Sequence, residues 1–198
     1  MLLEIHPENP QPRRILQVVE ILQNGGVIIF PTDSVYAMGC DIRQAKAFEK
    51  LCRIKGIKPQ KAQFSFLLSG LSHISEYTKP FDREVFKLLK ANLPGPYTYI
   101  LEASNLVPTL FRNNRKTIGI RVPNCEITRQ LIEGIGGPLV STSIHNDSDQ
   151  IMDYLADPEE IHSLFGKDVD LVIDGGPGKI KPSSVIDCTG PEPIIVRE

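Results

Sequence analysis

The hydrophobic positions of the chain fall into two alternating kinds of segment. Apolar residues spaced three or four apart predict helices, because that spacing lines one helix face. Short β-branched and aromatic runs, or alternation of apolar and polar residues, predict strands. The predicted helices are Pro10–Gln23, Ala45–Lys55, Arg83–Leu93, Ile127–Ile135 and Pro158–Phe165. The predicted strands are Val27–Phe30, Phe64–Leu68, Tyr97–Leu101, Thr117–Val122, Pro138–Ile144, Asp170–Ile173, Ser184–Asp187 and Ile194–Val196.

Proline and glycine support these boundaries. Pro94-Gly95-Pro96 and Gly136-Gly137 each follow a predicted helix and cannot continue it. Helices and strands alternate without a fixed repeat, which predicts an α/β fold with a twisted, open, mixed sheet and flanking helices. We expect residues 1–198 to form a single domain, because this length suits one well-buried core.

Composition and charge exclude several classes of protein. The formal net charge of -2 disfavours a protein that coats nucleic acid, so any such contact needs a local basic patch. No apolar run approaches the ~18 residues that a membrane span requires. The cysteines are far apart and form no C-x-x-C pair, which disfavours a zinc site and predicts reduced thiols in a cytoplasmic protein. They are Cys40, Cys52, Cys125 and Cys188.

The segment Pro31–Cys40, PTDSVYAMGC, follows a predicted buried strand and carries the most distinctive chemistry of the chain. Residues two apart in an extended segment face the same side, so Thr32 and Ser34 could bind one polar ligand together. Tyr36 adds a third hydroxyl. A strand-to-loop turn stabilised by Ser34 and Asp33 fits the same residues.

A basic stretch follows the second predicted helix. Residues 53–61, RIKGIKPQK, carry four positive charges and no acid. Gly56 and Pro59 interrupt the helix, so we expect these charges on a loop. Lys55 and Lys58 are candidates to bind a phosphate or carboxylate, although a solvated surface run fits as well.

Two later strands place polar groups among apolar ones. In KTIGIRVP, Thr117 and Arg121 share one face. An arginine there needs an anionic ligand or an acidic partner within the protein. In PLVSTSIHND, Ser141 and Ser143 share a face at a strand end, where open α/β sheets bind ligands, and His145 follows. A Ser-His-Asp hydrolase is disfavoured because no G-x-S-x-G elbow surrounds these serines.

The last candidate motif is DGGPGKIKPSSVID, residues 174–187. Glycines before Ser183 and Ser184 could let the backbone approach a phosphate. A plain hairpin is the alternative.

Taken together and in this order, these segments resemble the YrdC family of threonylcarbamoyl-AMP synthases. The matching pieces are PTDSVYAMGC, KG-x-K-P, PGPYTYIL, TIGIRVP, PLVSTS, DGGPG, SSVID and IIVRE, from about Ile28 to Arg197. The resemblance implies a YrdC-like twisted sheet with a concave, basic pocket. It also implies that L-threonine, bicarbonate and Mg²⁺-bound ATP give threonylcarbamoyl-AMP and pyrophosphate, and that a partner complex modifies a tRNA adenosine.

The resemblance also implies a role for each matching residue. Thr32 would contact threonine, and Arg121 would pair with its carboxylate. The threonine side would comprise Thr32, Ser34, Tyr36, Arg121, Ser183 and Ser184. The nucleotide side would comprise Lys55, Lys58, Thr117, Ser141, Ser143 and Arg197, and the catalytic candidates are Lys55, Lys58, Ser143 and His145. No protein residue is expected to hold a metal.

The chain departs from the synthase pattern on the nucleotide side. The synthases carry K-x-R on the basic loop, whereas this chain has Lys55-Gly56-Ile57, and lysine at position 58 lacks the bidentate fork of arginine. They carry S-x-N on the serine strand, whereas this chain has Ser143-Ile144-His145. These departures, and the strings RIKG, STSI and PTDS, are most similar to the YciO-like branch.

Three functions therefore stay open from the sequence. The first is an enzyme, or a former enzyme, that binds ATP, AMP or threonylcarbamoyl-AMP. The second is a non-catalytic protein that binds tRNA, double-stranded RNA or the ribosome through its clustered basic residues. The third is a carbamoyl-adenylate hydrolase or transferase with His145 as a base.

Overall fold

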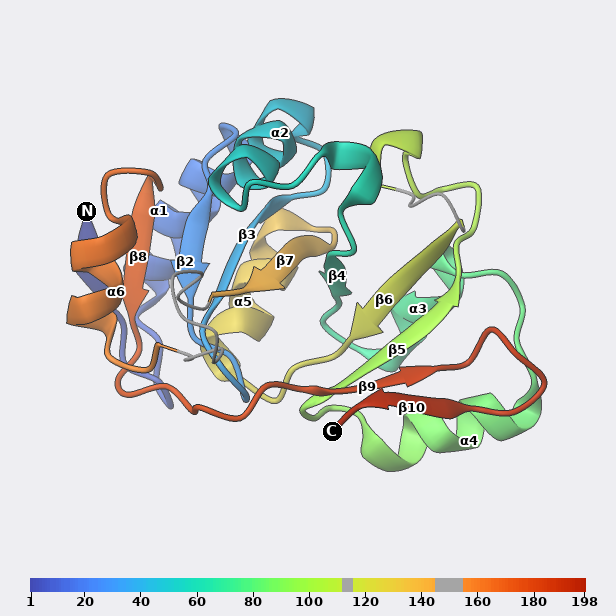
Figure 1. Cartoon of the computed structure of the whole chain (residues 1–198). Coiled ribbons are helices and arrows are strands. Elements are labelled where there is room, and N and C mark those ends of the chain that lie inside the picture. Colours follow the sequence, from blue (N-terminus) through green and yellow to red (C-terminus); the bar gives the residue numbers. More distant parts are fainter. Residues whose placement is uncertain (112–115, 145–154) are drawn as a thin grey trace.

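A ten-stranded sheet forms the centre of the protein, in the order β1-β8-β2-β3-β7-β4-β6-β5-β9-β10 (Figure 1). The computed structural model describes residues 1–111, 116–144 and 155–198. The strands are β1 (Leu2–Glu4), β2 (Ile28–Phe30), β3 (Ala37–Asp41), β4 (Ser65–Leu67), β5 (Tyr97–Glu102), β6 (Thr117–Arg121), β7 (Leu139–Ser143), β8 (Leu171–Asp174), β9 (Ser184–Asp187) and β10 (Ile194–Arg197).

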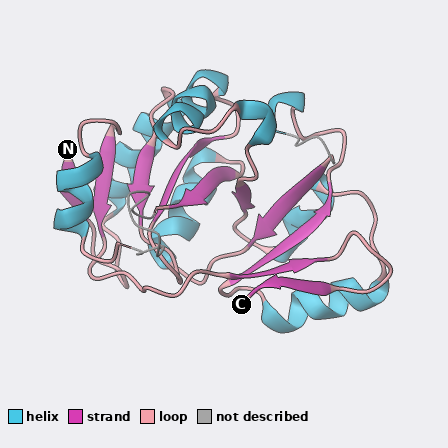
Figure 2. Ribbon diagram, viewed as in Figure 1, coloured by secondary structure: helices cyan, strands magenta, loops and turns pink. Residues whose placement is uncertain are grey.

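Helices flank both faces of the sheet, as Figure 2 shows. The α-helices are α1 (Pro12–Gln23), α2 (Ala45–Ile54), α3 (Ile74–Tyr77), α4 (Arg83–Asn92), α5 (Glu126–Ile135) and α6 (Pro158–Phe165). Short 3₁₀ turns are η1 (Pro59–Lys61), η2 (Leu71–His73) and η3 (Thr109–Phe111). Four neighbouring pairs are parallel (β1–β8, β2–β8, β4–β6 and β5–β9), and the other five are antiparallel. The predicted α/β fold with a mixed open sheet is therefore confirmed.

Two apolar cores lie on opposite faces of the sheet. One core joins α1 and α5 to β1, β8, β2, β3 and β7, with Leu22, Phe30 and Leu131 fully buried. The other core packs residues of α2, α3, α4 and α6 against the opposite face, where Phe66 and Tyr99 are buried. Both cores follow from the alternation of side chains along each strand.

The sheet face that packs against α1 and α5 is apolar on one half of the sheet and polar on the other. Leu139 of β7 and Leu67 of β4 belong to the α1–α5 core. Ser141 and Ser65 point to the same side, because each is two residues from its leucine. No described residue of α1 or α5 lines the cavity that these serines face. This part of the sheet can therefore carry polar side chains.

The sequence located most of these elements. Each predicted helix and strand is present, with its ends shifted by three residues at most. The predicted inward residues of α1 (Ile15, Val18, Val19 and Leu22) are all buried. Asp157 caps α6 as expected, because its carboxylate accepts a hydrogen bond from the Glu159 backbone N–H at 2.9 Å.

Three elements were missed. The predictions lacked β1, the four-residue helix α3 and the strand β3. The omission of β3 is a correction to PTDSVYAMGC, because Ala37 to Asp41 form a buried central strand between β2 and β7. Met38 and Cys40 point into the core under α2.

No helix within the described ranges is long and apolar enough to cross a membrane. All four cysteines are free, and Cys40, Cys52 and Cys188 are buried. Burial raises the pKa of the Cys52 thiol to about 11, with a smaller contribution from Glu49. This thiol is therefore protonated and unreactive at neutral pH.

The close packing at β3 gives a first prediction. A Cβ atom at Gly39 would lie 2.3 Å from the Val140 carbonyl oxygen of β7. We expect Gly39→Ala to lower the free energy of unfolding by about 1–3 kcal/mol, measured by urea denaturation. Gly137→Ala is the matched control, because nothing lies within 4 Å of its added Cβ. Equal stabilities of the two variants would contradict the prediction.

Candidate functional site

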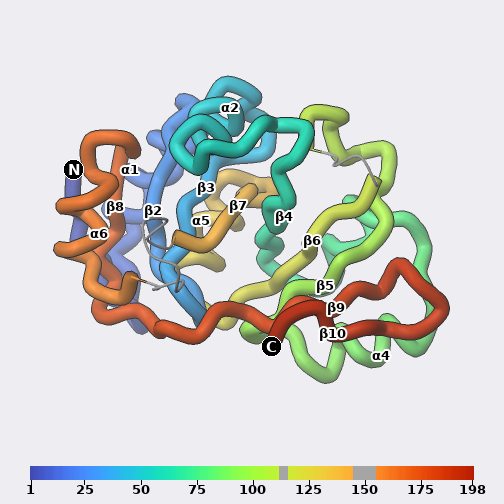
Figure 3. The backbone as a smooth tube through the Cα atoms, in the orientation of Figure 1, coloured from blue at the N-terminus to red at the C-terminus, as the bar shows by residue number. Residues whose placement is uncertain are grey.

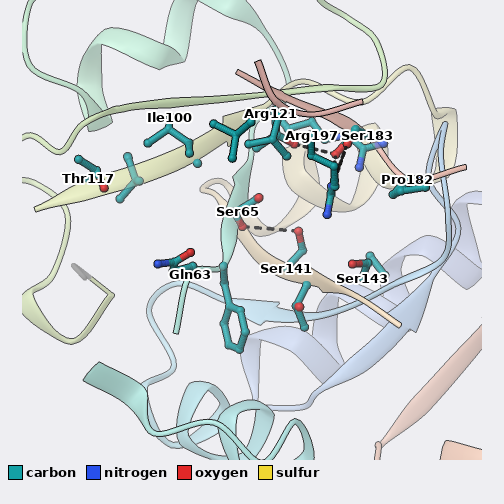
Figure 4. A pocket seen from close by; sticks show the side chains of 18 of the residues that line it. Gln63, Ser65, Ile100, Thr117, Arg121, Ser141, Ser143, Pro182, Ser183 and Arg197 are labelled. Carbon is teal, nitrogen blue, oxygen red and sulfur yellow. Dashed lines mark hydrogen bonds between the residues drawn. The ribbon is translucent and has the colours of Figure 1, made fainter. Parts of the chain in front are cut away.

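A cavity of about 650 Å³ opens on the half of the sheet face that α1 and α5 leave free. This volume is typical of small-molecule sites. Figure 4 shows side chains from β4, β5, β6 and β7 and from the chain around β9 converging on it. Hydroxyl side chains recur along the lining: Ser34, Ser65, Thr98, Thr117, Ser141, Thr142, Ser143, Ser183 and Thr189.

One row of paired residues forms the floor. Consecutive partners across β7, β4, β6, β5 and β9 are Ser141, Ser65, Gly119, Ile100 and Asp187, and all of them line the cavity. A Cβ atom at Gly119 would come within 3.1 Å of the Ser65 hydroxyl and 3.2 Å of the Thr98 methyl. Glycine at this position therefore leaves the floor open between two polar walls.

Arg121 forms the centre of the most buried polar cluster at the cavity. Its Nη2 donates to the Ser34 hydroxyl at 2.8 Å, to the Thr32 hydroxyl at 3.2 Å and to the Asp33 carboxylate. The Arg121 and Asp33 side chains are 8% and 6% exposed. The second Asp33 oxygen accepts a hydrogen bond from the Asn124 backbone N–H at 2.9 Å. The acidic partner that the sequence left open is therefore Asp33.

One donor of this cluster has no partner. Arg121 Nε is the buried side-chain polar atom without a hydrogen-bond partner among the described residues. A buried donor left unpaired costs about 1–3 kcal/mol. Arg121 also lines the cavity, so this strained polar balance lies at the edge of the ligand space.

A second polar corner lies around Ser183, before β9. The Ser183 and Thr98 hydroxyls are 2.9 Å apart and hydrogen-bonded. Arg197 Nη2 donates to the Ser183 carbonyl oxygen at 2.8 Å, and its Nε donates to the same oxygen at 3.2 Å. Figure 4 shows Arg197 and Ser183 together at the cavity wall. Arg197 remains half-exposed, so its charge is accessible from the cavity.

The structure gathers part of the predicted site. Ser34, Arg121 and Ser183 of the threonine side line the cavity. Thr117, Ser141, Ser143 and Arg197 of the nucleotide side also line it. His145, a predicted catalytic residue, lies outside the described residues.

Four other predicted residues lie outside the described lining: Thr32, Ser184, Lys55 and Lys58. Thr32 sits behind Ser34, where its hydroxyl donates to the Val35 carbonyl at 2.7 Å. Lys55 ends α2 and Lys58 is exposed before η1, so the basic loop lies beside the cavity rather than in it. After Ala37, the next lining residue along the chain is Ala62, which follows the basic loop.

Tyr36 also lies outside the lining, because β3 points its ring to the other side. Its hydroxyl donates to the Gly176 carbonyl at 2.7 Å and accepts from the Gly175 N–H at 3.1 Å. Burial raises the pKa of Tyr36 to about 12, with a smaller contribution from Asp174. The phenol therefore stays protonated and can keep both bonds at neutral pH.

The sequence analysis missed several lining residues: Ser65, Thr98, Asp187 and Thr189. A signal existed for two of them. In the strands FSFLL and YTYIL a hydroxyl residue takes a place on the face opposite the apolar Phe66 and Tyr99. Asp187 gave no such signal, because it ends a short strand. Its carboxylate accepts hydrogen bonds from the Thr189 hydroxyl at 2.6 Å and from the Thr189 backbone N–H at 2.9 Å.

Within the described ranges, no three His, Cys, Asp or Glu residues gather as a metal site would require. Asp187 is the one carboxylate of the described cavity lining. Mg²⁺ in nucleotide sites is commonly held by the phosphates, water and one or two carboxylates. The described lining therefore offers a cation one carboxylate, and its other ligands would have to come from a bound molecule and water.

Comparisons with known proteins agree with this geometry. Residues 20–198 match the model of the Sua5/YciO/YrdC family, described as "Telomere recombination". YciO of Escherichia coli (strain K12), an uncharacterized protein, is 45% identical over 195 residues, which are 98% of this chain and 93% of YciO. The threonylcarbamoyl-AMP synthase of Halorhodospira halophila is 29% identical over 182 residues, which cover 91% of this chain and 93% of the synthase.

Solved structures show the same fold. The crystal structure of E. coli YciO has a TM-score of 0.93 at 43% identity and covers 100% of this chain and 95% of its own. The Pyrococcus abyssi Sua5 structure, which is complexed with L-threonine, has a TM-score of 0.90 at 24% identity. It covers 100% of this chain and 57% of its own, and at this identity the likeness concerns the fold.

The buried ion pair gives a second prediction. Removing one partner of such a pair leaves an uncompensated charge, so we expect Asp33→Ala to lower the free energy of unfolding by about 3–5 kcal/mol. Glu102→Ala is the control, because its pair with Lys79 is 54% and 57% exposed and should contribute about 1 kcal/mol or less. Urea denaturation measures both. A loss at Asp33 no larger than that at Glu102 would contradict the prediction.

Proposed function

Because the chain belongs to the Sua5/YciO/YrdC family, we propose that its cavity binds an adenine nucleotide together with threonine or threonylcarbamoyl-AMP. The observation that carries the proposal is the hydroxyl-lined floor between two arginines, Arg121 and Arg197. Phosphate, carboxylate and carbamoyl oxygens all accept the hydrogen bonds that such a surface offers.

The two polar corners would divide the ligand between them. The Arg121 corner has a buried N–H without a described partner and the Ser34 hydroxyl, so it suits the amino-acid portion. The Ser183–Arg197 corner and the serines of β7 suit the nucleotide. A threonine carboxylate at Arg121 would share the guanidinium with Asp33. Similarity to the H. halophila synthase supports this division.

The proposal is that the cavity binds these ligands, and whether it also catalyses the synthase reaction is a separate question. Lys55 and Lys58 lie outside the described lining, and the K-x-R and S-x-N patterns are replaced. In a synthase reaction the threonine nitrogen attacks the carbon of bicarbonate, and a C–O bond breaks as water leaves. The carbamate oxygen then attacks the α-phosphorus of ATP, and the bond from that phosphorus to the β-phosphate oxygen breaks as pyrophosphate leaves. This reaction needs positive charge where the phosphates separate, and the basic loop would have to move to supply it.

Calorimetric titration with ATP, AMP and threonine, singly and together, tests the binding proposal. We expect the nucleotide to bind, and Ser143→Ala and Arg197→Ala each to weaken that binding about tenfold through a lost hydrogen bond or charge. Lys87→Ala on α4 is the control, because this exposed lysine pairs with Glu84 on its own helix and lies outside the described cavity lining. If the unaltered protein gives no heat of binding with any of these ligand combinations, the proposal is wrong.

An assay for threonylcarbamoyl-AMP and pyrophosphate decides whether catalysis accompanies binding. We expect Lys55→Ala to change AMP affinity by no more than about twofold, because Lys55 does not line the cavity. If the unaltered protein is a synthase, Lys55→Ala should lower turnover and leave AMP affinity intact. A large loss of AMP affinity would place the basic loop in the nucleotide site.

RNA binding is the second candidate function, and one contact favours it. The 3₁₀ turn η1, within the basic loop, packs against η3, which leads into the basic segment before β6. Lys58 and Lys61 are exposed there, as is Lys116. The fold thus places the end of the basic loop against η3, which precedes Lys116 in the sequence.

A mobility-shift titration with double-stranded RNA tests this second function. We expect binding whose log affinity falls linearly with log salt, and a shallower slope for Lys58→Glu/Lys61→Glu. Lys87→Glu, a charge reversal on α4, is the control. Binding that is absent at low salt, or equal for both reversals, would count against it.

A further inference from the structure

The connection from β8 to β9, residues 175–183, is a strap across the sheet. It passes six strands in the sheet order, from one side of the molecule to the other. Figure 1 and Figure 3 show this orange-to-red segment running along one edge of the sheet between its two halves. Its last residues, Pro182 and Ser183, form part of the cavity wall. The position of that wall therefore depends on how the strap is held.

Tyr36 holds the beginning of the strap. Its hydroxyl bonds to the backbone of both Gly175 and Gly176. Gly176 has a φ of +87°, and its N–H bonds to the Asp174 carboxylate at 2.9 Å. A Cβ atom at Gly178 would lie 2.6 Å from the Tyr36 ring, so the turn is pressed against that ring. One buried side chain thus contacts three residues at the start of the strap, and the Gly178 N–H also donates to the Ala156 carbonyl at 2.7 Å.

The far end has its own anchors. Ser183 bonds to Thr98 and accepts from Arg197, and the Ser184 N–H donates to the Pro96 carbonyl at 3.0 Å. Between the two ends, residues 179–182 make no hydrogen bond or ion pair with the described remainder of the chain. Lys179, Ile180 and Lys181 are exposed. The path of residues 179–182 is therefore set by the anchors at the two ends of the strap.

We propose that Tyr36 is a positioning residue, whose hydroxyl sets the path of the strap and thereby the place of Pro182 and Ser183 in the cavity wall. The same segment reaches the other corner of the cavity, because Thr32, Asp33 and Ser34 hold Arg121. Tyr36 thus joins the wall to the Arg121 corner without touching a ligand. The idea that this wall contacts a nucleotide rests on the proposed function. The idea that Tyr36 sets the position of the wall does not.

A second buried tyrosine provides a matched control. Tyr99 is as fully buried as Tyr36 and belongs to the same core, and its hydroxyl reaches the Leu88 carbonyl of α4 at 3.5 Å. Burial also raises its pKa to about 12, against a smaller lowering by Asn92. Tyrosine to phenylalanine at either position removes one buried hydroxyl and keeps the ring. Only Tyr36 contacts the strap.

Amide exchange and ¹⁵N relaxation by NMR test the proposal on the protein without ligand. In Tyr36→Phe we expect the Ser184 amide, eight residues beyond the nearer of the altered bonds, to exchange about tenfold faster, and the order parameters of residues 179–181 to fall. In Tyr99→Phe both should match the unaltered protein. A purely local role would affect Gly175 and Gly176 alone, and that outcome would overturn the proposal, as would equal effects in the two variants.

Nucleotide titration adds a second readout. We expect Tyr36→Phe to weaken nucleotide binding about three- to tenfold, and Tyr99→Phe to leave it unchanged. If the unaltered protein binds no nucleotide, the proposed function fails, and the exchange data still decide the role of Tyr36. If Tyr36→Phe loosens the strap and binding stays unchanged, the strap does not shape the nucleotide site and the inference is overturned.

Discussion

The ion pair between Arg121 and Asp33 is the contact on which the geometry of the cavity depends. A guanidinium this deeply buried needs a compensating charge, and the Asp33 carboxylate supplies it from the segment between β2 and β3. Strands β7 and β4 lie between β3 and β6, so the pair links parts of the sheet that are not neighbours. The segment that holds Arg121 also holds the strap through Tyr36. The two corners of the cavity are thereby placed relative to each other.

The second constraint is the unequal cover of one sheet face. Where α1 and α5 pack, that face must be apolar, and it carries residues such as Phe30 and Leu139. Where they do not pack, the strands line the cavity, and serine, threonine and glycine take positions that aliphatic residues hold elsewhere on this face. The opposite face is apolar under its helices from β2 to β9. The apolar core on one face of the sheet thus holds the strands together, and the uncovered part of the other face can carry the polar residues of a binding site.

The sequence predicted much of this arrangement, for identifiable reasons. Alternation in TIGIR predicted that Thr117 and Arg121 share a face, and both line the cavity. It did not predict β3, because that strand is buried on both faces and shows no alternation, and a conspicuous motif overlaps it. Whether Arg121 faces a ligand or an acid could not be decided either, since Asp33 is 88 residues away in the chain.

Other site assignments could not be predicted, because they depend on where a residue lies in the folded chain rather than on its type. Lys55 and Lys58 lie in the KG-x-K-P segment that resembles the family, yet the turn at Gly56 and η1 leaves them outside the described cavity lining. Tyr36 carries a hydroxyl in a polar motif, but the pleat of the strand turns it toward Gly175 and Gly176. Such roles follow from the path of the strap across the sheet, and no local pattern encodes that path.

The strand order also affects how the chain can be made. Strand β1 pairs only with β8 in the sheet, with Leu2 opposite Val172, and β8 also completes β2. A ribosome releases residues 2–4 long before residues 171–174, so the first strand has no sheet partner while most of the chain is synthesised. Pairs so distant in sequence close slowly. That edge of the sheet can therefore assemble only late in synthesis, when the final quarter of the chain emerges.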